Sequence, residues 1–355
     1  MGDDTAIYLP VGDPLAFGYQ FYAFPLAIQA ADSRTADWVL SNFIQVEFDR
    51  RGQECDVPFS FYLYDYAISP WLEVVRGTRR WYSSSTMCDV IREGLTKGYY
   101  AYTIVDEYHI PNRESSGIEH FPHDILVHGF DHSTDSFTVL GFDQRMHFRS
   151  TSVGGAEFAK AYARLDGPDM ENAPVLFYRL RNQPDFGYQP ITYELNLELI
   201  RRTIDEYLRS WDTSRHFEAL RRPRDCAYGL ECYTLLENYL RSYATGQNPY
   251  DIRHLHVLWE HKRLMTARVR RIGEVSRPLP DLEAAAERIE SMSFALRNAM
   301  IRNHIRGERQ DFLDNAVGML DRIRSAEEAM LRTLLARLPD GGPAPERARA
   351  RIGGR

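Results

Sequence analysis

His123 begins an apolar run that ends at Asp131, and its position makes it the residue of this chain best placed to do chemistry. A polar turn follows, and a second apolar run, 137–141, leads to Asp143. Two apolar runs joined by a short loop of Asp, His, Ser and Thr are typical of a β-hairpin. The hairpin places His123 and Asp143 on neighbouring antiparallel strands, where cross-strand neighbours lie close together.

Such a pair is suited to general base catalysis. A catalytic histidine needs a neighbour that fixes its tautomer and supports the positive charge of its imidazolium form. We therefore predict that His123 is a general base and that Asp143 orients it. The alternative is purely structural, with a histidine at a strand start and an aspartate in a loop.

The four cysteines offer only one candidate for the nucleophile that His123 would activate. Cys55 follows a polar stretch with two arginines, which could lower the pKa of its thiol, and it is the candidate nucleophile. Cys88 is expected to be a small core residue of a short helix. Cys226 and Cys232 are expected to be structural, and the absence of a C-x-x-C pair argues against a disulfide framework.

A metal site is an alternative interpretation of one histidine-rich stretch, which contains His120, His123, His128 and His132. Alternation along a strand directs His123 and His128 to opposite faces, whereas zinc needs three or four converging ligands. The sequence contains neither a P-loop nor a G-x-G-x-x-G motif. We therefore predict no metal and no cofactor.

The elements that must position these residues change in character near residue 190. Before it, runs rich in β-branched and aromatic residues predict strands at 59–64, 99–105, 124–142 and 175–180. Helical spacing predicts helices at 86–97 and 152–165. From residue 196 onward, the apolar spacing is helical almost throughout and predicts about five helices. The fold class is therefore predicted to be α+β, with antiparallel strands first and helices afterwards.

These patterns predict three parts: an α+β domain at 1–190, an α-helical domain at 191–340 and a disordered tail at 341–355. Of the 355 residues, 44% are hydrophobic and 26% are charged, which is typical of a globular protein. The net charge of −7 argues against nucleic acid as the main partner. With no membrane-spanning run and no signal peptide, we expect a cytoplasmic protein that does not bind membranes.

Motifs scattered over most of the chain resemble the butirosin biosynthesis protein H family. In the first half they are Gly98-Tyr99-Tyr100-Ala101-Tyr102, Val105-Asp106-Glu107-Tyr108 and the run from His123 to Asp131. The segment 38–46 fits the same pattern, as do 228–233, 251–253 and 260–265 in the helical half. The resemblance implies a fold similar to that of papain-like and bacteriocin-processing peptidases.

The resemblance also implies acyltransferase chemistry. The family's named member uses a Cys-His-Asp triad to move an aminoacyl-type group from a carrier-protein thioester to an amine, and its relatives accompany nonribosomal-peptide and other antibiotic biosynthesis genes. By position, His123 corresponds to the base and Asp143 to its orienting carboxylate. The nucleophile is missing, because the stretch 17–27, where the family has its cysteine, contains neither Cys, Ser nor Thr.

Two functions follow from this pattern. The first is acyl or aminoacyl transfer, or off-loading, from a carrier-protein thioester to a small-molecule amine that attacks directly after His123 deprotonates it. The second is a non-catalytic relative that binds a carrier protein or a biosynthetic intermediate as a scaffold. A hydrolase that uses Cys55 is a third possibility.

Overall fold

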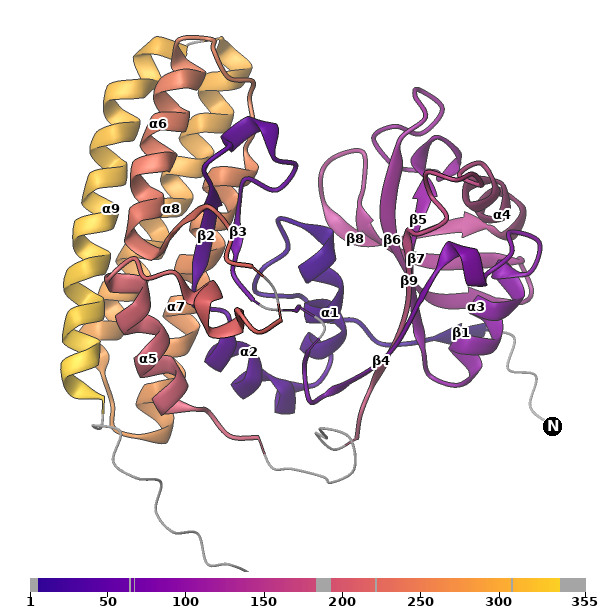
Figure 1. The fold of residues 1–355 in the computed structure, drawn as a ribbon, viewed down its shortest axis with the longest axis horizontal. Helices are drawn as coiled ribbons and strands as arrows, with labels where there is room; N and C mark the ends of the chain where they lie inside the picture. Colours follow the sequence, from indigo (N-terminus) through magenta and orange to yellow (C-terminus); the bar gives the residue numbers. More distant parts are fainter. Residues whose placement is uncertain are drawn as a thin grey trace, which may run out of the picture. The chain divides into compact units, whose positions relative to one another are not determined.

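The computed structural model describes residues 6–63, 65–66, 68–182, 193–220, 222–307 and 309–338. The chain forms two compact units (Figure 1): Met1–Ala36 with Asp65–Tyr193, and Asp37–Tyr64 with Glu194–Arg355. The first unit contains a large antiparallel sheet with helices, and the second is mainly helical. The predicted α+β class is thus confirmed. The predicted tail, 341–355, lies outside the described residues.

The division into units differs from the predicted boundary in one segment, because 37–64 belongs with the helices of the second half. This segment contains α2 (Ala36–Asn42), β2 (Val46–Asp49) and β3 (Phe59–Phe61). Strand β10 (Cys226–Tyr228) pairs with β2 and completes a three-stranded antiparallel sheet in the order β10-β2-β3. The partner strands are far apart in sequence, so local patterns did not reveal this sheet.

The first unit is built on a seven-stranded sheet in which all pairs are antiparallel. The order is β4-β9-β5-β6-β7-β8, with β1 paired to β6. The strands are β1 (Ala6–Tyr8), β4 (Leu72–Thr78), β5 (Tyr100–Asp106), β6 (Pro122–Asp131), β7 (Ser136–Phe142), β8 (Phe148–Gly154) and β9 (Pro174–Leu180). Strands β6 and β7 are the predicted hairpin. The helix predicted at 152–165 begins later, as α4 (Gly155–Ala163), because β8 occupies the preceding residues.

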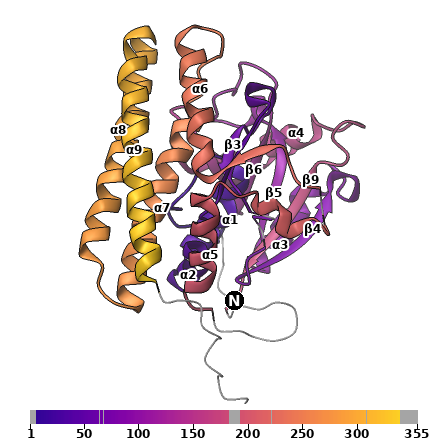
Figure 2. The ribbon, with the colours of Figure 1, turned by 60° about the vertical axis from the view of Figure 1, so that its left-hand side comes forward.

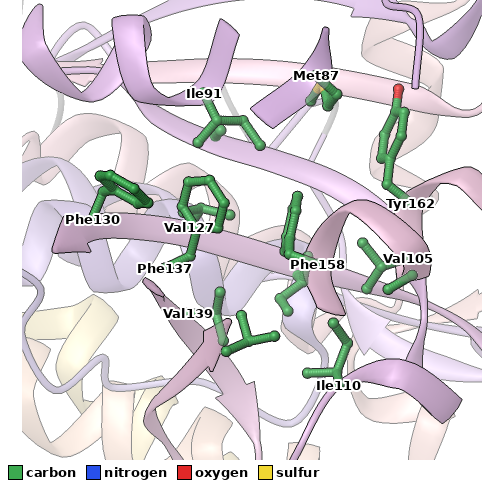
Figure 3. Close-up of a cluster of buried hydrophobic side chains, with 14 of the residues drawn as sticks. Met87, Ile91, Val105, Ile110, Val127, Phe130, Phe137, Val139, Phe158 and Tyr162 are labelled. Atoms are coloured by element: carbon green, nitrogen blue, oxygen red, sulfur yellow. The ribbon is translucent and has the colours of Figure 1, made fainter. Parts of the chain in front are cut away.

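Alternation along the strands gives this sheet two apolar faces. One face packs against α3 (Met87–Thr96) and α4 (Figure 3), through a cluster that includes Ile91, Val105, Val127, Val139 and Phe158. The intervening residues pack against α1 (Gln20–Ala30), through a cluster that includes Phe24, Ile28, Tyr102, Leu126 and Leu140. Helix α1 therefore covers the face of the sheet opposite to α3 and α4.

The described residues of the second unit form five long helices, of which α8 and α9 lie side by side (Figure 2). They are α5 (Leu197–Leu208), α6 (Cys232–Ala244), α7 (Arg253–Val275), α8 (Pro280–Arg306) and α9 (Arg309–Arg337). Arg268 of α7 is fully buried and donates to the carbonyl groups of Leu40 and Phe43, which fastens the C-terminal end of α2 to α7. No helix of the described chain is long and apolar enough to cross a membrane.

Candidate functional site

Three polar side chains meet where α1 begins and β6 starts. Gln20 is the first residue of α1, and its Nε2 atom lies 2.7 Å from His123 Nδ1. The same amide nitrogen lies 2.8 Å from the carbonyl oxygen and 2.8 Å from Oδ1 of Asp124. The backbone N–H of Phe142 donates to Gln20 Oε1 at 3.0 Å, which fixes the orientation of the carboxamide. The buried side chain of Gln20 therefore ties α1 to both β6 and β7.

The proton positions at this site follow from acceptor strength. His123 Nδ1 lies 2.9 Å from Asp124 Oδ1, so Gln20, His123 and Asp124 form a triangle of close contacts. A carboxylate is a stronger acceptor than an imidazole nitrogen, and we assign the Nδ1–H group of His123 as a donor to Asp124. The lone pair of the neutral imidazole is then on Nε2, which has no hydrogen-bond partner among the described residues.

The electrostatic environment favours the charged form of His123. Burial lowers the pKa of His123, but the hydrogen bond to Asp124 and the charges of Asp124 and Glu107 outweigh it, so the net pKa is raised. Glu107 Oε1 lies 3.9 Å from His123 Nδ1, and burial raises the pKa of this carboxyl group. The His123 side chain is 35% exposed, which leaves it accessible to a ligand.

A buried guanidinium completes the site. Arg113 is 3% exposed, and its Nη1 donates to the carbonyl oxygen of Phe142. Its Nη2 atom is buried and has no hydrogen-bond partner in the part of the chain that the structure describes. Gly141 makes room for both neighbours, because a Cβ atom there would lie 2.4 Å from Gln20 Oε1 and 2.8 Å from Arg113 Nη1. The fold thus accommodates the carboxamide and the guanidinium directly against β7.

Asp143 does not have the role that the hairpin predicted. Strand β7 ends at Phe142, and Asp143 Oδ1 accepts hydrogen bonds from the backbone N–H groups of Arg145 (2.8 Å) and His147 (3.0 Å). Its other carboxylate oxygen forms an ion pair with Arg149. Backbone N–H groups of the turn therefore bind the Asp143 carboxylate. Among the described contacts, the carboxylate closest to His123 is that of Asp124.

Within the described residues of the first unit, the structure places no cysteine beside His123. Cys88, the one cysteine of the first unit, lies on α3, on the face of the sheet opposite to α1, and burial raises the pKa of its thiol. Cys55 belongs to the second unit. The pKa of Asp49 there is lowered to about 2, chiefly by Arg51 and to a smaller degree by a hydrogen bond from Cys55. Cys226 and Cys232 are buried, and burial raises the pKa of Cys226 to about 12.

Sequence reasoning missed four members of this site: Gln20, Glu107, Arg113 and Asp124. The polar side chain of Gln20 stands out within Phe17-Gly18-Tyr19-Gln20-Phe21, but a carboxamide is not a nucleophile and so gives no catalytic signal. Asp124 was assigned to the strand face opposite to His123. The contact arises because both residues lie at the beginning of β6, where the Gln20 amide lies close to both.

The histidine-rich stretch is arranged differently from a shared metal site. His128 is buried within β6, with its Nδ1 3.0 Å from the Leu9 carbonyl oxygen and its Nε2 2.9 Å from Ser150 Oγ. It is therefore fully engaged away from His123. The structure instead brings together a different set, Asp106, His109 and His120, whose potential ligand atoms lie within 4.8 Å of one another.

Comparisons with known proteins add no family to these observations. A scan against protein-family models found no match to the chain, and a search of curated proteins found no significant match. The described geometry alone therefore defines what kind of protein this is. The chain combines an α+β unit, in which a buried glutamine contacts a histidine–aspartate pair, with a mainly helical unit.

Replacing Asp124 with asparagine is expected to lower the pKa of His123, because the carboxylate that stabilises the imidazolium is lost. A raised folded-state pKa contributes stability that is present in full below about pH 6.5 and is lost as the pH rises through the folded value. The substitution should therefore destabilise the first unit more at acidic pH than at alkaline pH. NMR titration of His123 measures its pKa, and urea unfolding at an acidic and an alkaline pH measures the loss of stability. An unchanged pKa of His123 would contradict the assigned hydrogen bond.

Proposed function

We propose that the first unit binds an aminoacyl- or acyl-loaded carrier protein, or the amine intermediate it reacts with, in specialised-metabolite biosynthesis, and that it does so without forming an acyl-enzyme. The observation that carries this proposal is the position of Gln20 at the start of α1, in contact with His123. The resembling family has its nucleophilic cysteine at the start of this helix. We also propose that the protein acts in the cytoplasm.

The chemistry of a carboxamide supports binding over covalent catalysis. An acyl-enzyme requires a thiolate or an activated hydroxyl beside the base, and an amide nitrogen is neither. The amide of Gln20 also has its hydrogen bonds satisfied by Phe142 and Asp124. Its side chain therefore closes the position that a nucleophile would need.

The remaining groups indicate the chemistry of the ligand. When His123 is neutral, the carboxylates of Glu107 and Asp124 beside it favour a cationic group such as a protonated amine. The buried Nη2 atom of Arg113 is a donor without a described partner and suits a carbonyl oxygen. An aminoacyl group carries both features, an amine and a carbonyl.

A second candidate is direct aminolysis of the thioester with His123 as general base. The observation that favours it is Nε2 of His123, which has no described partner and belongs to a ring oriented by Asp124. Because the pKa of His123 is raised, the base form becomes more abundant as the pH increases. Turnover by this route would rise with pH and would be lost in His123→Ala.

Binding is tested by calorimetric titration of the full chain with a peptidyl carrier protein in aminoacyl-loaded and unloaded forms. We expect preferential binding of the loaded form, and Glu107→Gln should weaken it by about tenfold through loss of one charge contact (about 1.4 kcal/mol). Glu119→Gln, which alters an exposed carboxylate of the same unit, is the matched control and should have no effect. Equal affinity for loaded and unloaded carriers, or no binding of either, would contradict the proposal.

A further inference from the structure

We propose that Asp106, His109 and His120 form a binding site for a divalent transition metal, with Zn²⁺ as the ion that best fits the donors. One potential ligand atom from each residue lies within 4.8 Å of the others. Two imidazole nitrogens and one carboxylate oxygen, completed by water, are a common zinc ligand set in proteins. This inference is independent of the thioester proposal, because none of the three residues contributes to the contacts of Gln20 and His123 described above.

The local fold explains why these three residues meet. Asp106 ends β5, and the 3₁₀ turn Glu107–His109 follows directly, so that His109 comes back towards Asp106 after one turn. His120 comes from the loop that leads into β6, which pairs with β5. A strand end, a tight turn and the returning loop thus contribute one ligand each.

The carboxylate of Asp106 is already oriented for a ligand. Asp106 is fully buried, and its Oδ1 accepts hydrogen bonds from the backbone N–H groups of Tyr108 (3.2 Å) and Phe121 (3.1 Å). Its Oδ2 is left to face His120, with a distance of 2.6 Å to Nδ1. Hydrogen bonds to the second oxygen are the kind of outer contact that orients metal-binding carboxylates.

Binding requires the three ligand atoms, which lie within 4.8 Å of one another, to adjust to the spacing around a single ion. The 2.6 Å contact between Asp106 and His120 is a hydrogen bond, whereas two ligands of a tetrahedral zinc ion lie about 3.3 Å apart, given bonds of about 2.0–2.1 Å. The metal would replace the shared proton, and the imidazole would move away by less than about 1 Å. His120 can move because its side chain is 52% exposed, while Tyr108 stacks against its ring at 4.5 Å and limits its orientation.

The experiment uses the full chain without a histidine tag, treated with a chelator and titrated with ZnCl₂ by calorimetry. Metal content after desalting is measured by mass spectrometry. We expect one zinc ion per chain, and His109→Ala and His120→Ala should each weaken binding by at least about tenfold. His132→Ala removes an exposed histidine from the β6–β7 turn and is the matched control, with unchanged binding expected.

Circular dichroism of each variant shows whether it is folded, and the exposed position of His120 makes His120→Ala the variant least disruptive to the core. Failure of the chain to retain zinc, or equal affinity in wild type, His109→Ala and His120→Ala, would overturn the site. The three residues would then serve only to hold the loop before β6 through the Asp106–His120 hydrogen bond. Because the experiment measures only metal binding, its result does not depend on whether the protein binds a carrier-protein thioester.

Discussion

Substitution of Gln20 by cysteine is expected to give the first unit the ability to acylate itself. The introduced thiol would replace the carboxamide beside His123 at the first residue of α1. The raised pKa of His123 favours an imidazolium, which together with the helix N-terminus stabilises a thiolate. Incubation with an acyl-pantetheine thioester, followed by intact-mass spectrometry, should reveal a covalent acyl group on the variant and none on the wild type.

Two controls separate acylation that depends on His123 from the background reaction of an exposed thiol with the thioester. His123→Ala in the Gln20→Cys background should slow acylation by about 10²–10⁴-fold, the usual contribution of a positioned general base. Phe21→Cys introduces a thiol at the next residue of the same helix, outside the contact with His123. If Gln20→Cys reacted no faster than Phe21→Cys, the position of Gln20 would not be that of a nucleophile.

Replacing Glu327 with glutamine is expected to destabilise the second unit by about 3–5 kcal/mol. The Lys262 ammonium contacts both oxygens of this carboxylate, at 2.6 and 2.7 Å, and both side chains are almost completely buried. The hydroxyl groups of Tyr207 and Tyr233 donate to the same carboxylate. Removing its charge leaves the ammonium buried and uncompensated. Urea unfolding followed by far-UV circular dichroism measures the loss.

This network joins four helices, α5, α6, α7 and α9, which explains the size of the expected effect. The neighbouring Glu328 is paired with Arg332 at the surface, and Glu328→Gln should change the free energy of unfolding by about 0.5 kcal/mol or less. The double variant Lys262→Met with Glu327→Leu should recover part of the loss, because the pair leaves no unpaired charge, although the hydroxyl groups of Tyr207 and Tyr233 lose their acceptor. A single variant within about 1 kcal/mol of wild type would show that the buried pair is not critical.

The parts of the fold that sequence could predict are those with a local signal. The β6–β7 hairpin and the helices after residue 196 follow from the spacing of apolar residues within each segment. The membership of 37–64 in the second unit depends on distant partners: β2 pairs with β10, and Arg268 binds carbonyl groups at the C-terminal end of α2. Such pairings leave no periodic trace in either segment.

At the candidate site, the contact predicted between His123 and Asp143 is replaced by one between His123 and Asp124. The observed register, with Leu126 opposite Leu140, would place Asp143 across from His123 if the ladder continued. It does not continue, because backbone N–H groups of the turn after β7 bind the Asp143 carboxylate first. Competition between a turn and a cross-strand contact depends on backbone conformation, which spacing alone does not specify.

The most direct test of the central claim is to incubate wild-type protein with an aminoacyl-loaded carrier protein and an amine acceptor, and to follow the thioester and the protein mass together. We expect a complex with the loaded carrier, no covalent acyl group on the protein and no acceleration of thioester loss over a protein-free control. Amide product formed at a rate that His123→Ala abolishes would contradict a binding role and establish direct aminolysis instead. An acyl group on the wild-type chain would contradict both accounts.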